Sequence, residues 1–409
     1  MIVPRLSIIV PTRERADTLL YTLQTIVEQK YQQCEIIVSD NYSQDNTKQV
    51  VESFFDDRIN YLNTGKRVSM SENWEFALKH ARGDFITYIG DDDGFIPDAV
   101  GSAMEILDKH KLNALVWEKA EYCWLDYVDE RMRNWISLKN DSYTLQIVSG
   151  PNKLRKVMKF REGYTKLPCL YNGIVRKCLV DSLRLQSSNG IFFNSISPDV
   201  FSGIALSMAV GNYLSTDYPF SVNGASRFSN GTSFMRQKAG KENQSPSAKF
   251  LAENNYEYDS RILLAPSTIT CLMGEYMQAK RYLSSLELPD PSWGLYVKSL
   301  IKSANRVFLP YEVLQSAAYT AKKIGLKIKI PECLDNVNNI LSPNIGFARD
   351  RFNFISPNKM VENIYDACQL VAGMLPKASL IDIRSPASVF MRRIAACFLI
   401  ELKKLYRSS

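Results

Sequence analysis

Three consecutive aspartates, Asp91, Asp92 and Asp93, are the residues whose type and spacing most clearly predict chemistry. Carboxylates held this close repel one another, so their pKa values rise unless a cation lies beside them. Mg²⁺ and Mn²⁺ supply that charge, because they bind carboxylate oxygens together with the phosphate oxygens of a substrate. A metal there stabilises the charge that develops on a leaving diphosphate. A solvated acidic turn, or a helix cap at Asp93, explains the same residues without any ligand.

A second polar segment, residues 40–47, follows another apolar run. Asp40 ends that run, and an aspartate at the end of a strand can accept hydrogen bonds from a nucleobase or a ribose hydroxyl. Asp45 and Thr47 are typical of the cap of a following helix. We therefore predict a binding role for Asp40 and a structural role for the other two.

The remaining metal-binding residue types are scarce or scattered. The chain has 2 histidines, and its 8 cysteines include no Cys-x-x-Cys pair. Dispersed cysteines of this kind indicate free thiols in a reducing compartment. A metal site in this chain must therefore be built from oxygen ligands.

The elements that position the carboxylates alternate between strand and helix patterns. Four short apolar runs are typical of buried strands, over residues 6–10, 35–40, 59–62 and 84–89. Helical spacing alternates with them over residues 17–29, 47–55 and 71–81. This succession predicts a mostly parallel α/β sheet with helices on both faces. Ligands of such sheets bind at the carboxyl ends of the strands, where the polar segments lie.

The rest of the chain predicts a second unit. At 409 residues the chain exceeds the roughly 250–300 residues at which single cores stop growing. Residues 229–247 are polar and predict a linker, and helical spacing recurs at 260–283 and 311–324. We predict an α/β domain over about 1–235, with an acceptor half from residue 100, and a mostly helical domain over 248–409.

Composition and charge exclude several classes of protein. A hydrophobic content of 45% and a charged content of 23% are those of a globular protein, and the net charge of +7 favours anionic partners. The basic residues are spread rather than massed with aromatic residues, which argues against nucleic acid. No apolar run reaches the roughly 18 residues of a membrane span, and the first residues do not have the layout of a signal peptide. These features predict a cytoplasmic protein.

The last segment, residues 389–406, predicts a basic amphipathic helix. Such a helix can bind the anionic inner face of a membrane, where lipid-linked substrates lie. It can equally pack its apolar face on the second domain. Both alternatives stay open, and so does a role of residues 248–409 in homo-oligomer formation.

Taken in order, the segments of the first hundred residues resemble the inverting glycosyltransferases of family 2, which have the GT-A fold. Residues 6–13, LSIIVPTR, are similar to the first strand and nucleotide-binding loop of that family, and residues 40–47, DNYSQDNT, to its uridine-contacting turn. Further similar segments follow at the expected spacing: Asn63-Thr64-Gly65, Asn73, Gly83-Asp84-Phe85-Ile86, the aspartates 91–93 and Pro97.

The resemblance implies a nucleotide-sugar donor, with UDP favoured, bound together with Mn²⁺ or Mg²⁺. It implies that Asp40 binds the base and that the aspartates form a motif of the DXD kind. Counted from Pro97, the family spacing makes Asp92 the likeliest metal ligand, with Asp91 beside it toward the ribose. The implied donor contacts are Pro11, Thr12, Arg13, Asp40, Asn41, Ser43, Asn73, Asp91 and Asp92, and the implied metal ligands are Asp91, Asp92 and Asp93. The chain departs from the family at Gly90, where an aspartate is common, and at Ser71-Glu72, where Ala-Arg is usual.

A catalytic base is implied as well. Family 2 enzymes use a carboxylate to deprotonate the acceptor hydroxyl, and Asp199 lies at a loop-to-helix junction about where the family places that base. An N-cap of the helix that runs to about Val210 is the structural alternative for Asp199, and Asp217 is a weaker candidate for the base.

The predicted function is the transfer of a sugar to a hydroxyl of a glycan, lipid-linked glycans included, in the synthesis of a bacterial surface polysaccharide such as a capsule or lipopolysaccharide. A nucleotidyltransferase is disfavoured, because the loop over residues 11–15 has no glycine. The alternative is a non-catalytic protein that binds a nucleotide sugar or a glycan through a degenerate transferase domain.

Overall fold

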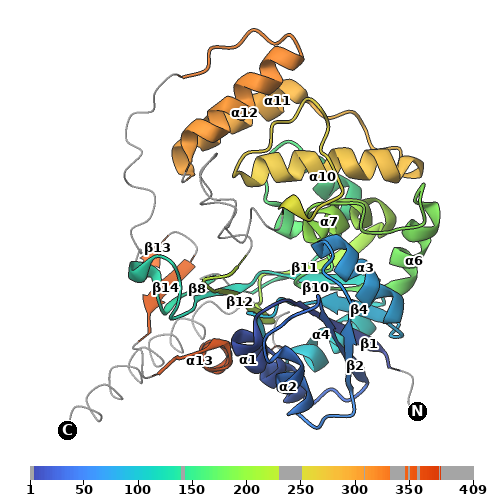
Figure 1. Cartoon of the computed structure of the whole chain (residues 1–409), viewed down its shortest axis with the longest axis vertical. Helices are drawn as coiled ribbons and strands as arrows, with labels where there is room; N and C mark the ends of the chain where they lie inside the picture. Colours follow the sequence, from blue (N-terminus) through green and yellow to red (C-terminus); the bar gives the residue numbers. More distant parts are fainter. Residues whose placement is uncertain are drawn as a thin grey trace.

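The computed structural model describes residues 4–139, 143–229, 251–307, 309–331, 346–348, 351–356, 360–376 and 378. Its main feature is an eight-stranded sheet that carries the predicted strands (Figure 1). In spatial order the strands are β3 (Ile59–Asn63), β2 (Cys34–Asp40), β1 (Leu6–Thr12), β4 (Phe85–Tyr88), β10 (Gly173–Arg176), β6 (Ala114–Trp117), β11 (Asn212–Thr216) and β9 (Leu145–Ser149). The first four are mutually parallel, whereas β10 and β9 are antiparallel to their neighbours.

Strand β1 shows why these segments form the centre of the sheet. Its side chains alternate between the two faces, as the strand period of two requires. Leu6, Ile8 and Val10 pack in one core, while Ile9 packs in the core on the opposite face. Helices therefore cover both faces, which the near-continuous apolar runs predicted.

Eleven helices are described, and they divide between the two faces and an outer layer. Their bounds are α1 (Ala16–Val27), α2 (Thr47–Glu52), α3 (Met70–His80), α4 (Ala99–His110), α5 (Gly150–Val157), α6 (Lys177–Gln186), α7 (Pro198–Ala209), α10 (Thr268–Tyr282), α11 (Trp293–Ser303), α12 (Pro310–Lys323) and α13 (Ile364–Met374). The predicted α/β class is confirmed, and so are the helices expected at 260–283 and 311–324.

A smaller, six-stranded sheet adjoins the main one. Its order is β13 (Gly346–Ala348), β14 (Arg351–Ile355), β8 (Trp135–Lys139), β7 (Ala120–Cys123), β12 (Ser221–Ala225) and β5 (Gly94–Phe95). Because β4 ends at Tyr88 in one sheet and β5 begins at Gly94 in the other, the three aspartates lie in the crossing between the sheets.

The part of the chain after residue 250 packs closely against the part before it. Helix α10 shares a core with α7, and α13 lies beside α1 (Figure 1). Strand β14 extends the smaller sheet by pairing with β8, and β13 pairs with β14 at its edge, which the prediction of a mostly helical region did not anticipate. The division of the chain near residues 235–248 stays a prediction, and residues 389–406 lie outside the described residues.

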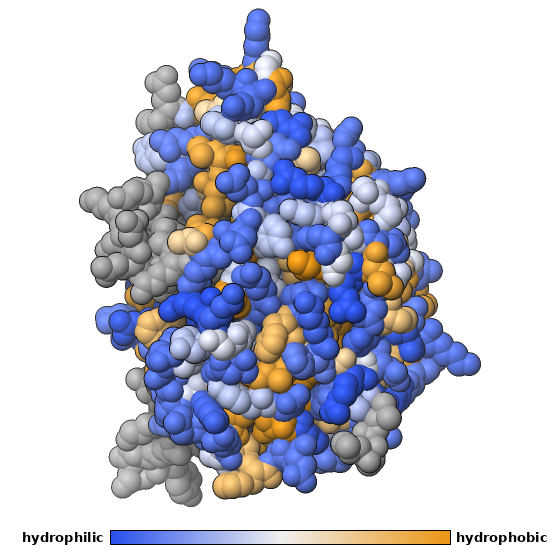
Figure 2. Space-filling view, turned by 45° about the vertical axis from the view of Figure 1, so that its right-hand side comes forward, coloured by the Kyte–Doolittle hydropathy of each residue, from blue (hydrophilic) through white to orange (hydrophobic). Residues whose placement is uncertain are grey.

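The surface is mixed in character. On the face shown in Figure 2, polar residues predominate and apolar residues form separate small patches. The most exposed apolar side chains, Phe55, Leu185 and Ile147, come from different elements. No helix among the described residues is long and apolar enough to cross a membrane. The cysteines that are described carry free thiols, as predicted.

Candidate active site

The carboxylates of Asp91 and Asp92 are held by different partners. Asp91 accepts hydrogen bonds from Thr12 Oγ1 (2.8 Å) and from Nη1 of Arg15 (2.7 Å). Oδ2 of Asp92 accepts from the hydroxyls of Ser226 (2.7 Å) and Ser229, and lies 3.5 Å from Nη1 of Arg15. One guanidinium therefore pairs with both carboxylates at the crossing between the two sheets.

Asp93 turns away from this pair. It is fully buried, and its Oδ2 accepts hydrogen bonds from the hydroxyl of Tyr171 and from the backbone N–H of Gly90 (3.2 Å). Its Oδ1 accepts from the backbone N–H of Gly224 (2.7 Å). Both oxygens are used to join the end of β4, β12 and the loop of Tyr171, and the predicted metal contact of Asp93 stays a prediction.

Burial changes the titration of this motif. Loss of hydration raises the pKa of Asp91, although Arg15 opposes that effect. Burial, reinforced by the charge of Asp92, raises the pKa of Asp93 to about 7. These shifts are those expected when carboxylates are crowded in a dry site.

The fit of a metal ion can be judged from the oxygens. Among the described residues, no group of three acidic, histidine or cysteine side chains is placed to hold a metal. Oδ1 of Asp92 is the one carboxylate oxygen of the motif without a hydrogen bond to a described residue. Mg²⁺ accepts one or two carboxylates when phosphate oxygens and water complete its shell. The geometry thus fits a metal ion that is bound by Asp92 together with a substrate. The other two predicted ligands, Asp91 and Asp93, have both carboxylate oxygens hydrogen-bonded to other residues.

Asp40 lies at the carboxyl end of β2, on the same edge of the sheet as the acidic motif and separated from β4 by β1. It is 2% exposed, and its Oδ2 accepts hydrogen bonds from the hydroxyl of Tyr61 (2.6 Å) and from Nδ2 of Asn63 (3.0 Å). Its Oδ1 accepts from the backbone N–H of Ser43 (2.9 Å). These bonds fix the carboxylate at the sheet edge, and its predicted contact with a base stays a prediction.

Two further residues, whose contact with the donor stays a prediction, hold the edge together. Asn41 pairs in both directions with the backbone of Val68, with Oδ1 accepting (2.9 Å) and Nδ2 donating (2.7 Å). Asn73 is buried, accepts from the hydroxyl of Ser39 (2.7 Å) and donates to its carbonyl oxygen (3.1 Å). Each amide is engaged at both ends, so their role is to position the loops around Asp40.

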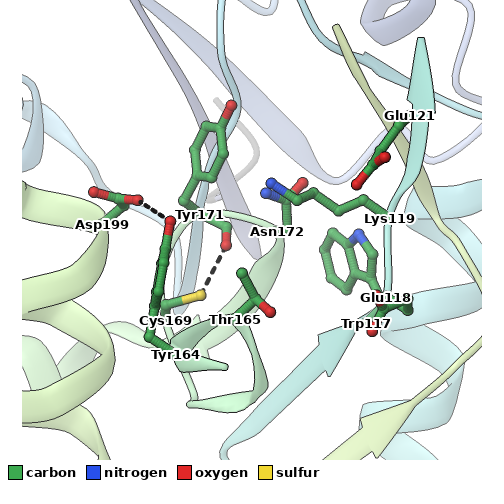
Figure 3. Close-up of a pocket in the computed structure, with 10 residues that line it drawn as sticks. All are labelled: Trp117, Glu118, Lys119, Glu121, Tyr164, Thr165, Cys169, Tyr171, Asn172 and Asp199. Atoms are coloured by element: carbon green, nitrogen blue, oxygen red, sulfur yellow. Dashed lines mark hydrogen bonds between the residues drawn. The ribbon is translucent and has the colours of Figure 1, made fainter. Parts of the chain in front are cut away.

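A pocket beside the motif contains Asp199 and holds about 520 Å³ of space, part of it open to solvent (Figure 3). Asp199 enters from one side, and Lys119 and Asn172 lie across from it. Tyr171 connects the pocket to the acidic motif, because its ring lines the pocket and its hydroxyl donates to Asp93.

Asp199 is placed by the first turn of α7. The N-cap is Ser197, so capping does not account for Asp199. Its Oδ2 accepts a long hydrogen bond from the hydroxyl of Tyr164 (3.4 Å), and burial raises the pKa of its carboxyl. A carboxylate with a raised pKa that faces a pocket is suited to accept a proton from a bound hydroxyl.

Helix α7 is itself held by a buried carboxylate from the C-terminal part of the chain. Oε1 of Glu275, on α10, accepts hydrogen bonds from the backbone N–H groups of Ile196 (3.1 Å) and Ser197 (2.7 Å). The hydroxyl of Tyr258 also donates to it (2.8 Å). Ser197 makes no side-chain capping bond, so Glu275 supplies the acceptor that the start of α7 needs.

Sequence reasoning missed four residues of this region: Arg15, Lys119, Tyr171 and Glu275. Arg15 had a detectable signal, since it follows the predicted loop over residues 11–13. The others had none, because their partners are distant in the sequence. The predicted Asp217 is paired with Lys139 (2.8 Å) and does not line the pocket.

Gly224 packs against the backbone of the acidic motif, so a larger side chain there tests whether the motif tolerates displacement. A Cβ added there would lie 1.8 Å from the backbone oxygen of Asp92. We expect Gly224→Ala to lower the free energy of unfolding by about 1–3 kcal/mol and to weaken UDP binding about tenfold, measured by urea unfolding and calorimetry. Gly294→Ala is the control, because nothing lies within 4 Å of that position. Equal UDP affinity of Gly224→Ala and wild type would contradict the expected distortion.

Part of the chain is similar in sequence to known proteins. Residues 7–165 match the family model described as Glycosyl transferase family 2. The chain is 39% identical over 105 residues to the GalNAc(5)-diNAcBac-PP-undecaprenol beta-1,3-glucosyltransferase of Campylobacter jejuni, which is 25% of this chain and 34% of that protein. It is 29% identical over 107 residues to the UDP-Glc:alpha-D-GlcNAc-diphosphoundecaprenol beta-1,3-glucosyltransferase WfgD of Escherichia coli, which is 26% of this chain and 42% of that protein.

The matched segments span less than half of these relatives' own lengths. Among solved structures, S. aureus TarS residues 1–349 in complex with UDP-GlcNAc is similar at 14% identity and a TM-score of 0.44, over 80% of this chain and 93% of that one.

Proposed function

Because residues 7–165 of this chain match the model of glycosyltransferase family 2, we propose that the protein transfers a sugar from a nucleoside diphosphate donor to a hydroxyl group of a glycan. UDP is the favoured nucleotide, and a lipid-linked glycan is the favoured acceptor. The product is a bacterial surface polysaccharide, assembled at the cytoplasmic face of the membrane.

One observation carries the proposal: Tyr171 links the acidic motif to the pocket that contains Asp199. The hydroxyl of Tyr171 donates to Asp93, and Tyr171 and Asp199 line the same pocket (Figure 3). A donor diphosphate at the motif would place its sugar toward the pocket, where an acceptor hydroxyl would lie against Asp199. Such proximity is itself a large part of catalysis.

Each residue then has a defined task. Asp40 orients the nucleobase, and Thr12 and Arg15 hold Asp91 in place. Asp199 takes the proton of the acceptor hydroxyl, whose oxygen attacks the anomeric carbon from the side opposite the leaving diphosphate. One such displacement inverts the configuration at that carbon. A divalent metal bound to Asp92 would supply charge that stabilises the leaving group.

The choice of substrates is supported by relatives. The names of the Campylobacter jejuni and Escherichia coli proteins state acceptors linked through a diphosphate to undecaprenol, and the second states UDP-Glc as donor. Membrane contact through residues 389–406 and oligomerisation stay predictions.

The proposal is tested by titrating the protein with UDP, GDP and CDP, each with and without Mn²⁺, and then by measuring UDP release from UDP-Glc in the presence of a GlcNAc-diphosphoundecaprenol acceptor. We expect metal-dependent binding of UDP and acceptor-dependent release. Binding without release from any tested sugar donor would favour the non-catalytic alternative, and no binding of any nucleotide would refute the donor site.

Asp92→Asn tests the metal ligand separately. Its Oδ1 is the available oxygen of the motif, so we expect the amide to abolish the strengthening of UDP binding by Mn²⁺ while metal-free binding stays within a few-fold of wild type. Calorimetry with and without Mn²⁺ measures both. Asp98→Asn is the matched control, because Asp98 is exposed and pairs with Lys30. An unchanged Mn²⁺ effect in Asp92→Asn would place the ligand elsewhere.

A further inference from the structure

Among the described residues, Arg15 is the only one that forms ion pairs with the acidic motif. Its Nη1 donates to Oδ1 of Asp91 (2.7 Å) and lies 3.5 Å from Oδ2 of Asp92, and its Nη2 donates to the carbonyl oxygen of Phe228. The side chain of Arg15 is 13% exposed, and those of the two aspartates are 7% exposed. The guanidinium is therefore fixed by several partners in a site that holds little water.

Little of the motif is left for a metal ion. Both carboxylate oxygens of Asp91 and of Asp93 accept hydrogen bonds, and Oδ2 of Asp92 accepts two. Only Oδ1 of Asp92 is without a hydrogen bond from a described residue. The affinity of a protein site for a divalent ion depends on the number of charged ligands that it supplies. A single carboxylate oxygen, with water in the other positions, therefore binds Mn²⁺ or Mg²⁺ weakly.

Arg15 weakens this site further, because its charge and that of a metal ion would share one carboxylate. The guanidinium lies beside Oδ2 of Asp92, and the oxygen left for a metal is Oδ1 of the same group. Like charges at this separation repel, and in a buried site the repulsion is poorly screened. The charge of Arg15 also offsets one of the negative charges that would attract a metal ion to Asp91 and Asp92.

A bound diphosphate reverses this balance. Its oxygens add negative charge beside the motif and complete the shell of a metal ion that has only one carboxylate ligand. Phosphate oxygens are also good partners for a guanidinium, so the diphosphate compensates the charge of Arg15 as well. The attraction of both cations to the diphosphate then outweighs the repulsion between them. The same arginine thus opposes a metal ion in the absence of nucleotide and tolerates it in its presence.

We propose that Arg15 makes metal binding at Asp92 conditional on the nucleotide, so that the two ligands bind as a pair. The proposal rests on the proposed function, which puts the diphosphate of the donor at the acidic motif. Coupling between two ligands is reciprocal, so UDP strengthens Mn²⁺ binding by the same factor by which Mn²⁺ strengthens UDP binding. Arg15 sets the size of that factor.

The test measures Mn²⁺ binding by the full chain, with and without UDP, from the electron paramagnetic resonance signal of free Mn²⁺. We expect wild type to bind Mn²⁺ at least about tenfold more tightly when UDP is present. Arg15→Gln removes the positive charge, so without UDP it should bind Mn²⁺ about tenfold more tightly than wild type, and the gain from UDP should shrink by a similar factor. Arg15→Lys keeps a positive charge and should stay within a few-fold of wild type.

Arg67→Gln is the matched control. It makes the same change of charge on the same edge of the sheet, but Arg67 is paired with Glu253 and not with the acidic motif. Arg13, the arginine of the predicted donor loop, is paired with the same carboxylate, so neither residue alters the charge around Asp92. Thermal unfolding of each variant separates an effect on Mn²⁺ binding from an effect on folding.

Three results would overturn the inference while UDP binding leaves the proposed function intact. They are unchanged Mn²⁺ binding by a folded Arg15→Gln, an equal gain in Arg67→Gln, and equal affinity of wild type for Mn²⁺ with and without UDP. The last result decides against the inference whatever the variants do. If wild type binds no UDP even with Mn²⁺ present, the proposed donor site fails and this inference fails with it.

Discussion

Asp199→Asn is expected to lower turnover by about 10²–10⁴-fold while UDP binding stays within a few-fold of wild type. The amide keeps the size of the side chain and its place in the pocket but cannot accept a proton. Asp40 and Asp92, the residues proposed to bind the donor, do not line the pocket of Asp199, so we expect donor binding to be left unchanged. Initial rates of UDP release with saturating acceptor, together with calorimetry for UDP, measure the two effects.

Asp217→Asn is the control for this experiment. Asp217 was the weaker sequence candidate for the base, and it is bound to Lys139 outside the pocket. Its amide variant should keep turnover within a few-fold of wild type. Near-normal turnover of Asp199→Asn would place the base elsewhere.

The pH dependence of the wild type gives an independent check. Asp199 must be ionised to act as a base, and burial raises its pKa. As pH falls through this raised pKa, kcat/KM should decline, and it should do so at a higher pH than the value of about 4 for an ordinary aspartate would give. Asp199→Asn should lack this acidic limb.

Much of the donor half could be predicted because its signals are local. The apolar runs of β1, β2 and β4 lie within single segments, and parallel strands bring their carboxyl ends to one edge. The strand pattern alone therefore places Asp40 and Asp91 near one another. Asp199 required the family resemblance as well, since a lone aspartate at the start of a helix is more often a cap.

The roles within the motif could not be predicted, because they depend on distant partners. Asp93 bonds to Tyr171 and Gly224, which lie 78 and 131 residues further along the chain. Those bonds tie Asp93 to two distant segments, and no local pattern encodes them. Strand β14 did have a signal, the alternation of Phe352 and Phe354, but its partner β8 lies more than two hundred residues earlier.

Glu275 shows how such long-range contacts link the C-terminal helices to the candidate base. It is fully buried, and burial raises the pKa of its carboxyl to about 8. Its ordinary pKa of about 4.3 applies in the unfolded chain, so the folded state binds the proton more tightly. By linkage, this group lowers the free energy of unfolding as pH rises between these two values, by up to about 1.4 kcal/mol per pH unit.

Glu275→Gln should remove this pH dependence and Glu275→Ala should break the contact itself. Gln keeps the oxygen that accepts from Ile196 and Ser197, so we expect its melting temperature to match wild type near pH 5 and to exceed it near pH 8. Ala leaves two buried N–H groups unpaired, which should cost about 2–5 kcal/mol of stability and lower turnover by displacing Asp199. Thermal unfolding at both pH values and UDP release measure these effects, with the exposed Glu257→Gln as control. If the difference in melting temperature between Glu275→Gln and wild type does not change with pH, Glu275 is ionised in the folded protein. Normal turnover of Glu275→Ala would mean that α7 holds Asp199 in place without Glu275.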